Sequence, residues 1–203
     1  MSHQLQCRCG QVRGLLVNPE AVNHAICYCR DCQAFAYFCG REGDALDERC
    51  GSRIVQAVPA NLTLQQGREQ LVCMRLTDKG LLRWYTRCCN TPFGNTMATR
   101  GISFVGLIST IFPGGSASIE RTFGPVRCSV HTHSAKGQPS PKQTGLGTAI
   151  GWFLRRVLWA RITGRYRINP LFDFDTGQPI SQPRVLGADE HAQLMAKVDA
   201  ARS

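Results

Sequence analysis

The sequence predicts a mainly β fold, followed by a C-terminal extension that contains one or two helices. The region from Gln11 to Thr110 reads as short strand-like runs separated by turn residues. A stretch rich in Gly, Pro, Ser and Lys then interrupts this pattern at residues 134–147. Apolar residues beyond it recur at helical spacing. With 43% apolar and 19% charged residues, the composition is that of a folded globular protein.

Each predicted strand is a run rich in β-branched or aromatic residues and bounded by turn formers. The runs are residues 12–17, 22–26, 54–58, 62–65, 70–76, 81–86 and 104–110. A helix of one or two turns is predicted over residues 31–38, directly after a group of cysteines. The Gly114-Gly115 pair after Pro113 predicts a turn and lacks the context of a phosphate-binding loop.

The chain is predicted to divide into three parts. Residues 1–133 form the β domain, residues 134–147 a linker or exposed loop, and residues 148–203 a basic, partly helical extension. The extension is predicted to hold one helix over 148–162 and a short one over 189–201.

The helix predicted over residues 148–162 combines apolar and basic side chains, with Arg155, Arg156 and Arg161 among the apolar positions. Such a helix can lie on an anionic membrane surface. We favour packing against its own domain or a partner subunit, since this is one segment with no lipidation signal.

The formal net charge is +10, which would attract anionic partners of several kinds. Charge alone does not choose among a nucleic acid, an acidic membrane and an anionic small molecule. The sequence has no base-reading motif and no interleaved aromatic pattern, so we expect no specific nucleic-acid partner. A solvated basic surface is the commonest origin of such an excess.

Eleven cysteines require either a disulfide framework or metal ligands. The first ten residues lack the apolar core of a signal peptide, so we expect a reducing compartment and a cytoplasmic location. Thiolate metal sites therefore become the leading interpretation. Zinc is the expected metal, because it is commonly bound by closely spaced cysteines, although iron also occupies thiolate sites.

The closely spaced cysteines fall into three groups. These are Cys7-Arg8-Cys9-Gly10, Cys27-Tyr28-Cys29-Arg30-Asp31-Cys32 and Cys88-Cys89. The first and last pairs could meet to form one four-ligand site. The middle group supplies three thiolates, which would leave an open coordination position unless Cys39 or Cys50 closes it. We assign no ligand role to His131 and His133, which are expected to face solvent beside the linker.

In this order, the motifs CxCG, CxCxxC and RWYTRCCNTP resemble the glutathione-dependent formaldehyde-activating (GFA-like, CENP-V-type) family over about residues 5–130. The resemblance is to a subfamily rather than to the founding enzymes. It implies a small Mss4-like zinc-binding β domain with two zinc ions. One zinc would be structural, held by Cys7, Cys9 and the late pair, and the other would lie at an active site formed by Cys27, Cys29 and Cys32.

The late motif departs from the family pattern. Aligning on Thr91-Pro92 places Cys89 on the second family cysteine and Thr86 on the first, with Cys88 displaced to the neighbouring position. Either Cys88 turns in as the fourth ligand, or the structural site is incomplete.

The resemblance also implies carbon-sulfur lyase chemistry on a glutathione adduct such as S-(hydroxymethyl)glutathione. A small thiol would then be the partner, with Arg30 and Arg87 as candidates for binding its carboxylates. The alternative is a non-catalytic binding or scaffold module stabilised by zinc, since a shared fold does not establish catalysis.

Overall fold

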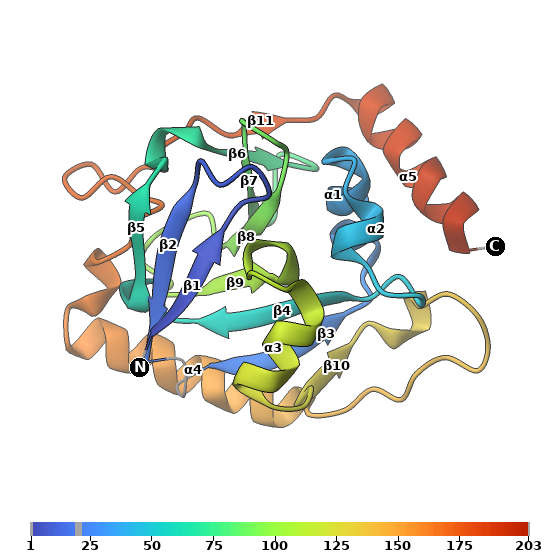
Figure 1. Ribbon diagram of the computed structural model, residues 1–203, viewed down its shortest axis with the longest axis horizontal. Helices are drawn as coiled ribbons and strands as arrows, with labels where there is room; N and C mark the ends of the chain where they lie inside the picture. Colours follow the sequence, from blue (N-terminus) through green and yellow to red (C-terminus); the bar gives the residue numbers. More distant parts are fainter. Residues whose placement is uncertain (1, 19–21, 203) are drawn as a thin grey trace.

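The protein is mainly β, with two sheets and a few helices (Figure 1). The computed structural model describes residues 2–18 and 22–202. The smaller sheet has the strand order β1-β2-β5, and the larger has the order β10-β3-β4-β9-β8-β7-β6-β11. Neighbouring strands are antiparallel, except that β10 runs parallel to β3 and β11 parallel to β6.

The strands predicted from the sequence are all present, with ends displaced by no more than a few residues. They are β2 (Arg13–Val17), β3 (Asn23–Cys27), β4 (Ser52–Ala57), β5 (Leu62–Gln66), β6 (Leu71–Arg75), β7 (Leu82–Thr86) and β9 (Val105–Ile108). The helix predicted after the second cysteine group is also present, as α1 (Arg30–Phe38). A mainly β fold with a few helices is therefore confirmed.

Several elements were not predicted. They are β1 (Ser2–Gln6), α2 (Glu42–Ala45), β8 (Pro92–Thr96), α3 (Gly115–Phe123), β10 (Cys128–Val130) and β11 (Arg184–Val185). The turn predicted at Gly114-Gly115 after Pro113 is present and leads directly into α3, which begins at Gly115. Gly114 has a φ of 84° and lies just before the helix, where a left-handed residue starts the new chain direction.

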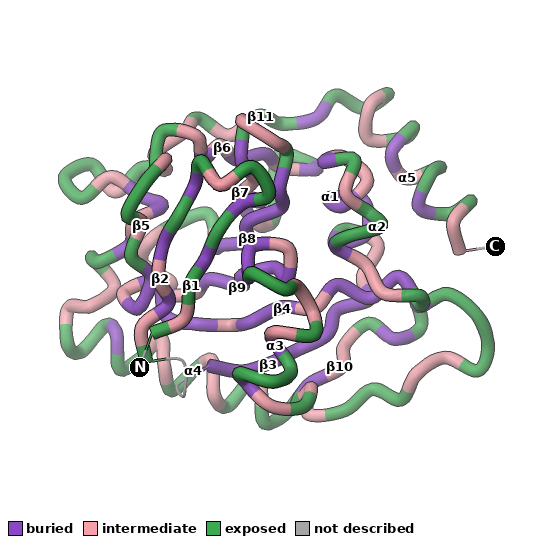
Figure 2. The backbone as a smooth tube through the Cα atoms, viewed as in Figure 1, coloured by how far each residue is buried: buried purple, intermediate pink, exposed green. Residues whose placement is uncertain are grey.

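Strand alternation gives the larger sheet two different faces. On β7, Leu82 and Trp84 point into the main core together with residues of the smaller sheet such as Leu5 and Leu16. Arg83, between them in sequence, points to the opposite face, where α1 lies. Figure 2 shows buried residues running through the central strands of this sheet.

The C-terminal residues return to the β domain. Helix α5 (Ala188–Arg202) packs against α1 and buries Leu194 and Val198, while β11 adds to the edge strand β6. Helix α4 (Leu146–Ile162) packs against β10 and lies at the bottom of Figure 1. Within the described part of the chain, no helix is both long and apolar enough to cross a membrane.

Gly145 fixes the start of α4. It has a φ of 66°, and a Cβ atom at this position would clash with the backbone carbonyl of Arg127. A residue without a side chain is therefore needed where the loop after residue 134 turns into α4 beside β10.

Candidate metal centres

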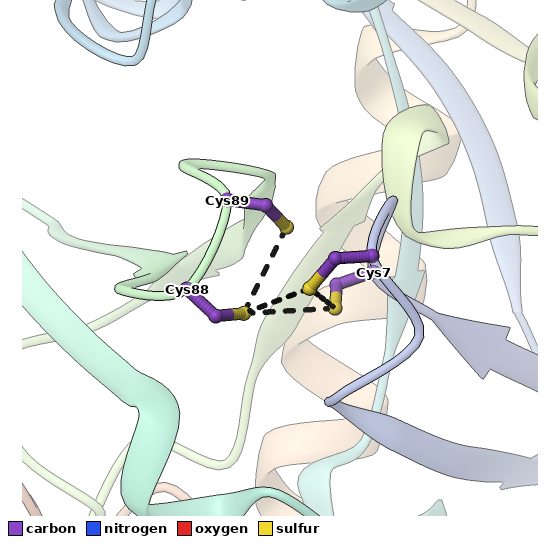
Figure 3. A group of neighbouring side chains, drawn as sticks. Cys7, Cys88 and Cys89 are labelled. Carbon is purple, nitrogen blue, oxygen red and sulfur yellow. Dashed lines mark hydrogen bonds between the residues drawn. The ribbon is translucent and has the colours of Figure 1, made fainter.

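Two turns from distant parts of the chain bring four cysteine sulfurs together (Figure 3). Cys7 and Cys9 lie between β1 and β2, whereas Cys88 and Cys89 lie between β7 and β8. We call these residues the four-Cys cluster. Cys88 Sγ is 3.3 Å from Cys9 Sγ and 3.9 Å from Cys7 Sγ, and all four sulfurs lie within 4.8 Å of one another.

These distances suit a tetrahedral metal ion. A zinc–sulfur bond of about 2.3 Å implies sulfur–sulfur separations of about 3.8 Å in a regular tetrahedron. The separations include 3.6 Å for Cys7–Cys9 and 3.8 Å for Cys88–Cys89, with 3.3 Å for Cys9–Cys88 and 3.9 Å for Cys7–Cys88 on either side. The adjacent cysteines thus both belong to the group, and the four-Cys cluster could hold a metal ion, with zinc compatible.

Backbone hydrogen bonds shape the two turns. The amide of Val12 donates to Cys7 Sγ at 3.2 Å, and the amide of Arg8 donates to Thr91 Oγ1 at 3.1 Å, which links one turn to the other. Although burial raises the pKa of Cys89, hydrogen bonds from Thr86, Thr91 and Cys9 outweigh it and lower that pKa to about 5. The turn therefore stabilises a thiolate, the form that binds metal.

The middle cysteines form a second group, which we call the three-Cys cluster: Cys27, Cys29 and Cys32. Their sulfurs also lie within 4.8 Å of one another. Cys27 ends β3, and the Cys29 sulfur caps α1 by accepting a hydrogen bond from the Cys32 amide at 3.4 Å. The strand-to-helix turn therefore points all three thiols to one place, and they too could hold a metal ion.

Neither Cys39 nor Cys50 joins the three-Cys cluster in the described structure. Cys39 is buried beside Ala36 and Leu76 in the core between α1 and α5, and burial raises its pKa. The proposal that one of these thiols closes the second site therefore has no geometric support. Three cysteine ligands leave room for a further ligand.

The space for a further ligand at the three-Cys cluster is a cavity of about 660 Å³ on the α1 side of the larger sheet. Cys27, Cys29 and Cys32 all line it, as do Cys128 and residues such as Ile54, Arg83 and Asn95 from neighbouring strands. Helix α4 forms part of the opposite wall with residues such as Ile150 and Phe153. A cavity of this volume is within the usual range for small-molecule sites.

Arg83 is the cation at this site, and sequence analysis did not single it out. Its side chain is 4% exposed, and Nη1 lies 3.9 Å from Cys32 Sγ and 3.3 Å from Asn95 Oδ1. Hydrogen bonds from the Cys27 and Cys29 thiols, assisted by the Arg83 charge, hold the pKa of Cys32 well below that of an ordinary thiol despite burial. The sequence signal that could have located it is strand alternation. Arg83 lies between the buried Leu82 and Trp84 on β7, so its side chain points to the opposite face of the sheet.

The arginines predicted to bind substrate carboxylates do not line this cavity. Arg30 forms an ion pair with Asp199 of α5, and Arg87 borders a separate pocket with Arg68 and Glu69. His131, to which no role was assigned, is exposed and does line the cavity. The parallel pairing of β10 with β3, in which Val130 is opposite Cys27, explains its position.

A family model described as a family of unknown function (DUF6151) matches residues 1–182. The chain belongs to this DUF6151 family. The matched range includes both cysteine clusters and all of α4. A search of curated proteins gave no match.

Among solved structures, the DUF6151 chain is similar to a crystal structure of a Rhodobacter sphaeroides protein from a structural genomics programme. The two are 22% identical, with a TM-score of 0.39, and the match covers 61% of this chain and 96% of the other.

Proposed function

We propose that the protein is a zinc-dependent carbon-sulfur lyase with an Mss4-like fold, related to the GFA-like enzymes. The reaction would join a small thiol to an aldehyde, or separate the two, at the three-Cys cluster. The observation that carries this proposal is the position of Cys27, Cys29 and Cys32 in the wall of a cavity large enough for a small molecule.

The two clusters would have different roles. The four-Cys cluster already has a full set of tetrahedral ligands, as is usual for structural zinc, and it ties together turns far apart in the sequence. The three-Cys cluster has one ligand fewer, as is usual for catalytic zinc. A zinc ion held there would supply positive charge that lowers the pKa of a coordinated thiol.

The reaction itself needs no oxidant or reductant. The thiol sulfur forms a bond to the carbonyl carbon, the carbonyl π bond breaks, and the thiol proton finishes on the new hydroxyl oxygen. His131 lines the cavity, and its imidazole would carry that proton from the sulfur to the oxygen. Arg83 would hold Cys32 as a thiolate, while the apolar walls limit the access of water.

The proposal can be tested by ¹³C NMR exchange between formaldehyde and its S-hydroxymethyl adduct, using glutathione and a simple alkyl thiol as acceptors. The zinc-loaded protein should accelerate exchange with at least one thiol. Cys29→Ser should abolish the acceleration, whereas Cys39→Ala, which alters a buried thiol outside both clusters, should retain it. No acceleration by the zinc-loaded protein would favour a non-catalytic binding or scaffold module.

A further inference from the structure

We infer that the cavity beside the three-Cys cluster selects an apolar thiol, or its aldehyde adduct, rather than a charged peptide thiol such as glutathione. This inference rests on the proposed function, because it assumes that a thiol occupies the cavity. It concerns the remainder of the ligand, which the cavity walls must accommodate.

The walls are predominantly apolar. Ile54, Val130 and Phe104 contribute from the sheet side, while Ile150 and Phe153 contribute from α4. The rings of Phe104 and Phe153 meet edge to face at 5.6 Å, which joins the helix to the sheet across the cavity. An alkyl or aryl group placed between these walls would gain the free energy of removing its surface from water.

The charged groups of the cavity are already engaged with each other. Apart from the cysteine thiolates, the charged side chains in the lining are Arg83 and Asp31, and Arg83 Nη2 lies 3.4 Å from Asp31 Oδ2. The other terminal nitrogen, Nη1, contacts Asn95 and Cys32. Glutathione has a carboxylate at each end and an ammonium group, and burying them without partners would be unfavourable.

The arginines that could have held those carboxylates lie elsewhere. Arg30 is paired with Asp199, and Arg87 borders another pocket. The cavity thus offers soft sulfur ligands at one point and apolar contacts around it. This combination suits a molecule with a thiol at one end and a hydrocarbon body.

Helix α4 provides a matched pair of positions for a test. Phe153 lines the cavity, whereas its neighbour Leu154 is 60% exposed and lies outside it. Phe153→Ser should therefore weaken the binding of long apolar thiols, while Leu154→Ser removes a comparable apolar side chain without changing the cavity.

The experiment uses the cobalt-substituted protein, whose thiolate-to-cobalt absorption bands report a new sulfur ligand. Alkyl thiols from ethanethiol to octanethiol are titrated alongside glutathione. Affinity should rise about fourfold for each added methylene that enters the cavity. Phe153→Ser should reduce octanethiol affinity at least tenfold and ethanethiol affinity little, with Leu154→Ser matching the unmodified protein.

The outcomes separate the two proposals. If glutathione perturbs the bands at concentrations equal to or below those of octanethiol, the apolar selectivity is wrong and the thiol chemistry stands. If no thiol perturbs them while cobalt fills both clusters, the proposed function is wrong as well. Equal octanethiol affinities for Phe153→Ser and Leu154→Ser would also overturn the inference.

Discussion

Arg83 Nη1 lies 3.9 Å from the Cys32 sulfur, although the two residues are 51 positions apart in the chain. The guanidinium is also 5.7 Å from the centre of the Phe35 ring, so it is held between a thiol and an aromatic face. A buried cation placed beside one member of the three-Cys cluster favours the thiolate that a metal requires.

Replacing this cation should weaken metal binding at one cluster only. Arg83→Met keeps most of the side-chain length but removes the charge, so affinity at the three-Cys cluster should fall about 10- to 100-fold, as for other residues that support metal ligands. Competition with a chelator at neutral pH measures the metal affinity of the three-Cys cluster in each variant. Arg30→Met is the control, because Arg30 is next to Cys29 in sequence but pairs with Asp199; equal losses in both variants would contradict the assignment.

Cys89 should contribute far more to stability than Cys128. Structural zinc contributes about 10–16 kcal/mol of folding free energy in small peptides, so removing one ligand by Cys89→Ala should cost about 3 kcal/mol or more. Cys128→Ala removes a buried thiol outside both clusters and should cost about 1 kcal/mol. Chemical unfolding of the zinc-loaded variants gives both values. Equal, small losses would remove Cys89 from the ligand set.

The free energy of unfolding should rise with pH between about 5 and about 8.5. The folded-state pKa of Cys89, about 5, lies below the value of about 8.5 for a thiol in an unfolded chain. The unfolded state therefore binds more protons in this window, and the stabilisation is lost as the pH falls through the folded pKa. Cys32, whose pKa is also lowered, acts in the same direction.

The corresponding measurement is denaturant unfolding of the metal-free protein across that pH range, for the unmodified chain and for Cys89→Ala. Removing Cys89 should reduce the rise. An identical pH dependence in the two proteins would show that Cys89 is not a stabilised thiolate in the folded chain.

Helix α5 should stabilise the β domain through its contact with α1. Leu194→Ala removes a side chain that is 7% exposed and should cost about 2–3 kcal/mol, lowering the melting temperature by about 4–10 °C. Lys197→Ala, on the exposed side of the same helix, should change stability by less than about 0.5 kcal/mol. Similar melting temperatures for both variants would indicate that α5 does not dock.

The sequence was most informative where local pattern decides structure. The β-branched runs located the strands β2 to β7 and β9, and the motif spacing grouped the cysteines that the turns bring together. Strand β8 was not predicted because Pro92 and Gly94 are typical of turns. A Cβ at Gly94 would lie 2.7 Å from the Gly106 carbonyl oxygen, so close strand approach, which is not visible in sequence, requires this glycine.

Local sequence patterns could not predict the cavity. Its walls combine β4, β7, β8, β10 and α4, which are brought together by long-range pairing. In the sequence, Arg83 is an ordinary strand residue. Phe153 belongs to a predicted amphipathic helix whose packing surface the sequence does not identify. Only the topology shows that both line the cavity beside the three-Cys cluster. The exposed apolar residues Leu154, Leu158 and Ile162 continue along α4 beyond it.

The most direct test of the account is the metal content of the purified chain and of two serine variants, measured by mass spectrometry together with circular dichroism. We expect two zinc equivalents in the unmodified protein, one for each cluster. Cys29→Ser should lose about one equivalent and keep its fold, whereas Cys9→Ser should lose about one and be strongly destabilised. A single equivalent in the unmodified protein, or loss of all metal with unfolding in Cys29→Ser, would contradict the account of two independent sites.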